Sequence, residues 1–181
     1  HAKSRQQGKA KRAWDILCRQ KDSFKNGNLD ARPDVFTYTS VINGCAFSFD
    51  ERDKADALEI ATKAMKELQE SLRTESANSF TYVSLLKVYS NLMPVGAERD
   101  VLVEKAFREC CKDGQVNSGV ITSLHAAAPK LASTLLHGVV NSDDLNVDRL
   151  PAEWSRNVKD GRRRPSQSRR RVSSNSHRRT E

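Results

Sequence analysis

Apolar residues in the middle of the chain recur with the spacing of a helix face. One stripe consists of Tyr38, Val41, Ile42 and Cys45, and a second consists of Tyr82, Leu85, Leu86 and Tyr89. Because the members of each stripe lie three or four positions apart, each predicts one apolar face of an α-helix. A broader stripe, whose small alanines permit close helix approach, comprises Ala57, Ile60, Ala61, Ala64, Met65 and Leu68.

The first two stripes belong to a duplicated motif. Phe36–Ile42 aligns without gaps with Phe80–Leu86, at an offset of 80 − 36 = 44 residues. A second motif follows each copy, since Lys63–Leu68 matches Lys105–Cys110. It also matches Arg12–Leu17, which no copy of the first motif precedes. We therefore predict repeated helical hairpins, in a chain that begins inside a unit whose first helix lies upstream.

The predicted hairpins need neighbours, because one hairpin cannot bury its apolar faces alone. The expected fold class is all-α, a solenoid of stacked helix-turn-helix repeats whose first helices form a concave surface. Asp34 and Asn78 stand just before the first helices, where their side chains are expected to cap free N–H groups.

A weaker third copy gives the chain its predicted organisation. Asn117-Ser118 matches Asn78-Ser79, but Gly119 replaces the aromatic residue of the earlier copies. The predicted units are a partial repeat over 1–32 (second helix only), repeats over 33–78 and 79–117, a degenerate capping repeat over 118–140, a loop and C-terminal epilogue over 141–154, and a tail over 155–181. The Arg/Ser-rich tail has almost no apolar residues and is expected to be disordered, since it cannot offset the entropy cost of folding.

The net charge of +8 resides in this tail. Residues 156–181 hold ten Lys/Arg and two Asp/Glu, so 10 − 2 = +8 accounts for the whole excess. Residues 33–155 carry 12 basic and 18 acidic residues, a net charge of −6. Bulk charge therefore does not make the predicted folded part a nucleic-acid binder.

Nothing in the sequence points to catalysis. There is no nucleophile–base pair, phosphate-binding glycine loop or zinc-ligand spacing. The cysteines form no C-x-x-C pair, which favours reduced thiols; they are Cys18, Cys45, Cys110 and Cys111. No stretch approaches the ~20 apolar residues of a membrane span. We expect a protein that is not an enzyme, needs no cofactor or metal and does not enter a membrane.

One motif resembles a known family. Pro33-Asp34-Val35-Phe36-Thr37-Tyr38-Thr39-Ser40-Val41-Ile42-Asn43-Gly44 resembles the start of a pentatricopeptide repeat, and Ala77–Tyr82 resembles it less closely. The similarity covers about residues 10–128, and Leu150–Val158 resembles the C-terminal ending of algal members. The repeat spacings of 44 and 39 residues exceed the family's usual length. The excess around Ser48–Lys54 and Met93–Arg99 predicts enlarged loops between paired helices.

The resemblance implies a right-handed α-solenoid that binds single-stranded RNA at about one base per repeat. It also implies a mitochondrial or chloroplast role in RNA processing, stability or translation. The implied base-reading residues are Thr39 with Asn78, Val83 with Asn117, and Asp34 for the truncated repeat, while Phe36 and Phe80 would stack on a base. The Thr39–Asn78 pair would favour adenine, whereas apolar Val83 would be unselective. Thr39 lies off the apolar stripe, so its hydroxyl is expected to face the groove.

The same residues have simpler interpretations that the sequence leaves open. Phe36 and Phe80 are also consistent with core or hydrophobic-staple positions, Thr39 with a solvated one, and Asp34 and Asn78 with helix caps alone. The tail offers phosphate contacts through Arg162, Arg163, Arg164, Arg169, Arg170 and Arg171, a phosphorylation site at Ser173, or no role. For the whole chain, the alternative is a helical protein-interaction scaffold without RNA binding, which the acidic middle and Val83 favour.

Overall fold

The computed structural model describes residues 8–71, 76–136 and 147–158. Within these ranges the chain is entirely helical and contains no β-strand. The α-helices are α1 (Lys9–Lys25), α2 (Val35–Cys45), α3 (Glu51–Ser71), α4 (Ser79–Leu92), α5 (Ala97–Lys112), α6 (Ser118–Ala127) and α7 (Pro129–Leu135). Three short 3-10 helices are η1 (Leu29–Ala31), η2 (Val147–Arg149) and η3 (Ala152–Trp154). The predicted all-α class is confirmed.

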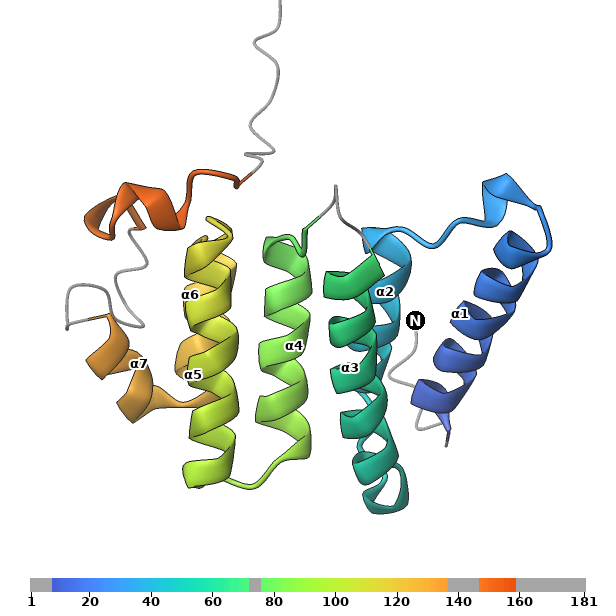
Figure 1. Ribbon diagram of the computed structural model, residues 1–181. Coiled ribbons are helices and arrows are strands. Elements are labelled where there is room, and N and C mark those ends of the chain that lie inside the picture. The colour runs from blue at the N-terminus through green and yellow to red at the C-terminus, as the bar shows by residue number, and fades with distance from the viewer. Residues whose placement is uncertain (1–7, 72–75, 137–146, 159–181) are drawn as a thin grey trace, which may run out of the picture.

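The helices pack as neighbouring antiparallel pairs (Figure 1). Helices α2, α4 and α6 form one row, in which α4 contacts both of the others. Helices α1, α3 and α5 pack against this row, since α1 and α3 contact α2, and α5 contacts α4 and α6. The first turns of α2, α4 and α6 lie at the same edge of the row, which is the upper edge in Figure 1.

The predicted apolar stripes form the core. All eight members of the two first-helix stripes are buried; they are Tyr38, Val41, Ile42, Cys45, Tyr82, Leu85, Leu86 and Tyr89. In the second helices, the shared motif places Leu17, Leu68 and Cys110 at equivalent positions, and each is completely buried. Periodicity therefore located the buried faces, because a side chain that recurs every three or four positions returns to the same side of a helix.

Short polar side chains start each first helix. Asp34 Oδ1 accepts a hydrogen bond from Thr37 N at 2.8 Å, and Asn78 Oδ1 accepts one from Thr81 N at 3.0 Å. Asn117 Oδ1 accepts one from Val120 N at 3.0 Å in the same way. The predicted caps at Asp34 and Asn78 are confirmed, and each satisfies an N–H group that the helix itself leaves free.

The predicted enlargement of the loops between paired helices is wrong. Residues 46–50 connect α2 to α3 and residues 93–96 connect α4 to α5. The additional length lies in α3, which has 21 residues against 16 in α5. Helix α3 begins early because Asp50 Oδ1 accepts a hydrogen bond from Arg52 N at 3.1 Å, which brings residues 51–54 into the helix.

No helix in the described ranges combines the length and the apolar character that crossing a membrane would require.

Candidate functional site

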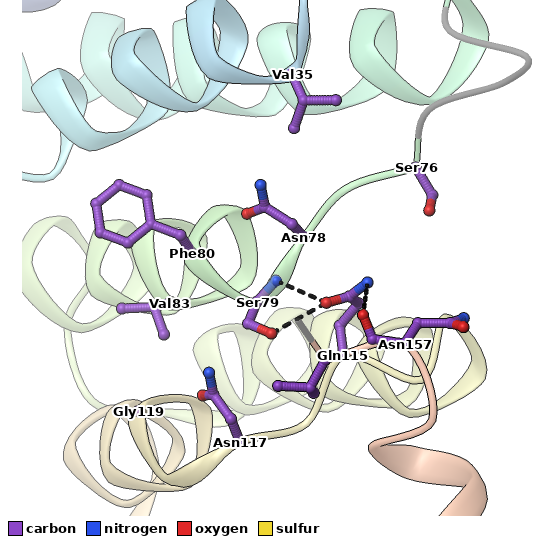
Figure 2. Close-up of a pocket in the computed structure, with 11 residues that line it drawn as sticks. Val35, Ser76, Asn78, Ser79, Phe80, Val83, Gln115, Asn117, Gly119 and Asn157 are labelled. Atoms are coloured by element: carbon purple, nitrogen blue, oxygen red, sulfur yellow. Dashed lines mark hydrogen bonds between the residues drawn. The ribbon is translucent and has the colours of Figure 1, made fainter. Parts of the chain in front are cut away.

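A groove with a volume of about 1050 Å³ lies at the edge where α2, α4 and α6 begin (Figure 2). Ser79, Phe80 and Val83 of α4 and Gly119 of α6 line it. Val35 of α2 lies across from them, and the turn between α5 and α6 contributes Gln115. Asn157 and Val158, from the C-terminal segment Val147–Val158, also line it. The groove therefore joins parts of the chain that are far apart in sequence.

The structure brings four of the predicted site residues together. Asn78, Phe80, Val83 and Asn117 all line the groove. Phe80 is 56 % exposed, so its ring is available to a ligand. The interpretation of this residue as a core aromatic is therefore wrong.

Three predicted site residues lie outside the groove lining. Phe36 is 76 % exposed on the first turn of α2, so the core interpretation is wrong here too. Asp34 caps α2, and its carboxylate accepts hydrogen bonds from both the N–H and the hydroxyl of Thr37 at 2.8 Å. The Thr37 N–H bond in particular lowers the pKa of Asp34, which favours an ionised carboxylate at the helix N-terminus. The third residue is Thr39.

The expectation that Thr39 faces the groove is wrong. Its side chain is 2 % exposed, and its Oγ1 lies 2.7 Å from Oγ1 of Thr81 on the neighbouring first helix. The apolar stripe marks one buried face of α2. Because α2 also packs laterally against α4, the flank that carries Thr39 is buried as well.

The buried threonine pair orients the amide of Asn78. Thr81 Oγ1 donates to Asn78 Oδ1 at 3.2 Å and lies 2.7 Å from Thr39 Oγ1, so the threonine pair holds the Asn78 oxygen in place. Asn78 Oδ1 also accepts from Thr81 N. Since its oxygen is occupied, Asn78 keeps its Nδ2 hydrogens for a ligand in the groove.

The contact between α4 and α6 has an asparagine cap but no threonine pair. Val83 and Val120 stand at the positions that correspond to Thr39 and Thr81. Asn117 Oδ1 accepts the cap bond from Val120 N, and its Nδ2 hydrogens can donate to a ligand. Val83 lies close to Gly119, where an added Cβ would be 3.5 Å from Val83 Cγ2. The two asparagines therefore present donors beside an apolar surface.

Sequence reasoning missed Gln115, Asn157 and Val158. The tail was expected to begin at residue 155, but residues 155–158 are bound to the turn between α5 and α6. Ser155 Oγ donates to Val116 O at 2.8 Å, and Asn157 N donates to Gly114 O at 2.9 Å. Bonds to backbone carbonyls are hard to predict from a sequence. The available signals were the apolar residues Leu150 and Trp154 and the resemblance of Leu150–Val158 to a family C-terminal ending.

The arginines predicted to contact phosphate lie outside the described residues, namely Arg162, Arg163, Arg164, Arg169, Arg170 and Arg171. Ser173 lies outside them as well.

Three of the four cysteine thiols, those of Cys45, Cys110 and Cys111, are unsuited to nucleophilic chemistry. All four are free, and Cys45 and Cys110 are buried. Burial raises the pKa of Cys45 and that of Cys111 to about 12, which keeps both thiols protonated at neutral pH. In the described ranges, no three His, Cys, Asp or Glu side chains gather as metal ligands.

Replacing Thr39 with valine tests the buried threonine pair. We expect Thr39→Val to lower the free energy of unfolding by about 1 kcal/mol, because a buried hydrogen bond is lost at nearly constant shape. Urea unfolding monitored by circular dichroism measures the change. Ser40→Ala is the matched control, since Ser40 Oγ is exposed and bonds only to Phe36 O of its own helix. Equal stabilities for both variants would contradict the described role of Thr39.

Comparison with models of known protein families, with curated proteins and with solved structures found no match to this chain. The resemblance to pentatricopeptide repeats therefore rests on the residues of the chain itself.

Proposed function

We propose that this chain binds single-stranded RNA as a right-handed solenoid of pentatricopeptide type, and that the groove beside α4 and α6 accepts a nucleobase. The observation that carries the proposal is the convergence of Asn78, Asn117 and the exposed ring of Phe80 on one groove. Such a combination offers hydrogen bonds to a base edge and a flat surface for a base face.

The chemistry of the groove suits a base. The amide nitrogens of Asn78 and Asn117 are donors, whereas their oxygens already serve the helix caps. They therefore match acceptor atoms on a base edge. Phe80 provides the stacking surface, and a stacked base contributes about 1–3 kcal/mol. Thr39 has no direct contact in this scheme, because it is buried; it acts on the base only by fixing Asn78.

The charge distribution assigns base contacts to the groove and phosphate contacts to the tail. Residues 33–155 have a net charge of −6, so the groove is not a phosphate-binding surface by bulk charge. Lysines and arginines after residue 158 supply the positive charge instead. Phosphate contacts make binding sensitive to salt, whereas stacking and base-edge bonds do not.

Removing the ring of Phe80 tests the proposal. We expect Phe80→Ala to weaken binding of short oligoadenylate, oligocytidylate or oligouridylate by roughly five- to a hundredfold, the equivalent of about 1–3 kcal/mol. Fluorescence anisotropy with labelled RNA measures the affinity. Phe49→Ala is the matched control, because Phe49 is also 56 % exposed but follows the opposite end of α2. No RNA binding by the wild-type chain, or equal losses for the two variants, would refute the proposal.

A helical protein-interaction scaffold is the second candidate. It is favoured by exposed apolar residues at the edge opposite the groove, where Phe47 and Phe49 stack edge to face with ring centres 6.2 Å apart. Val95, in the next hairpin, is 82 % exposed. In the Phe80 experiment, absence of RNA binding by the wild-type chain would favour this candidate.

A further inference from the structure

The C-terminal segment Val147–Val158 is attached to the helices by backbone bonds as well as by side chains. Trp154 O accepts from Val116 N at 2.8 Å, and Gly114 O accepts from Asn157 N at 2.9 Å. The Trp154 ring lies edge to face on the buried ring of Phe107, with centres 5.7 Å apart. A segment with two backbone bonds and an aromatic anchor has a defined position on the turn between α5 and α6.

Gln115 links this segment to the first turn of α4. Its Oε1 accepts from both the N–H and the hydroxyl of Ser79, at 3.1 and 3.0 Å, while its Nε2 donates to Asn157 O at 3.2 Å (Figure 2). The side chain is 8 % exposed, so these bonds are largely shielded from water. Because Ser79 follows Asn78, the position of the C-terminal segment is coupled to that of the amide in the groove.

From these contacts we propose that the C-terminal segment is a wall of the RNA groove that determines base preference, with Gln115 as its positioning residue. The inference rests on the proposed function. The segment places Asn157 and Val158 on the groove surface. In Figure 2, Asn157 lies beside Gln115, on the opposite side of Asn78 from Val35. A base that enters between Phe80 and Asn117 thus meets a surface of fixed shape, which restricts the bases that fit.

The same segment fixes where the basic tail starts. Residues 159–181 hold nine Lys/Arg and two Asp/Glu, so their net charge is 9 − 2 = +7. Since Val158 lines the groove, this charge is tethered at the groove itself. Tail and wall therefore have separable effects: the tail governs the dependence of affinity on salt, and the wall governs the choice of base.

The experiment uses full-length protein and measures two quantities, the ratio of affinities for oligoadenylate and oligouridylate, and the slope of affinity against salt. Gln115→Met removes the link, and Trp154→Ala loosens the segment at a point outside the groove lining. Gln69→Met is the matched control, because Gln69 makes one exposed bond, to Glu109 on the other face. A fourth variant changes six tail arginines, 162–164 and 169–171, to glutamine. Circular dichroism verifies that each variant is folded.

We expect Gln115→Met and Trp154→Ala to move the affinity ratio toward one by about three- to tenfold, because the segment loses its fixed position, with an unchanged salt slope. The arginine variant should show the reverse, a shallower salt slope and an unchanged ratio. The inference would be overturned if wild-type protein bound oligoadenylate and oligouridylate equally, or if both segment variants kept the wild-type affinity ratio. The proposal of RNA binding would stand in either case. Absence of RNA binding by the wild-type chain would overturn the proposed function and this inference with it.

Discussion

Leu86→Ala is expected to lower the free energy of unfolding by about 2–5 kcal/mol. Leu86 is 1 % exposed and lies on α4, the helix that contacts both other members of the first-helix row. The substitution removes buried apolar surface and leaves a cavity that neighbouring helices fill only in part. The loss should be large because α4 joins the two halves of the array, and a cavity there weakens packing on both sides.

Chemical unfolding monitored by circular dichroism measures this loss. Lys87→Ala is the control, since Lys87 is the next residue on the same helix and is exposed. Its replacement should change stability by no more than about 0.5 kcal/mol. If the two variants had the same stability, α4 would not be the central packing element described above.

The second large effect is expected at Gly114. Its φ of +67° lies in the left-handed region, and an alanine Cβ there would lie 2.6 Å from Arg156 Cγ and 3.2 Å from the backbone oxygen of Glu153. The backbone conformation costs a residue with a side chain about 1–2 kcal/mol, and overpacking adds about 1–3 kcal/mol. We therefore expect Gly114→Ala to lower the free energy of unfolding by about 2–5 kcal/mol or to displace the C-terminal segment.

Urea unfolding gives the stability of Gly114→Ala, and tryptophan fluorescence reports on the segment, because the chain has only two tryptophans and Trp154 packs on Phe107. Gly96→Ala is the control. Its φ of 162° is extended, and no atom lies within 4 Å of an added Cβ, so this variant should be close to wild type. A Gly114→Ala protein with wild-type stability and fluorescence would contradict the described docking of residues 153–157.

The candidate site was predictable in part. Asn78, Phe80, Val83 and Asn117, which the resemblance to pentatricopeptide repeats implied as site residues, lie on one groove. Equivalent positions in successive hairpins recur at the same edge when the hairpins pack side by side, so internal similarity carries spatial information. Thr39 was placed wrongly by the same reasoning, because periodicity on one helix does not reveal which flank a neighbouring helix covers.

The sequence alone determined the helices, their buried faces and their caps. Each depends on residues within about one turn of one another. The spacing of Tyr38 and Val41 therefore predicts a buried face, and that of Asn78 and Thr81 predicts a helix cap. Only the tertiary structure decided that Thr39 is buried against Thr81, 42 positions away, and that Gln115 bonds to Asn157 across an equal separation. Contacts of that kind cannot be inferred from the spacing of residues within one helix, because they depend on which helices become neighbours and which polar groups then meet.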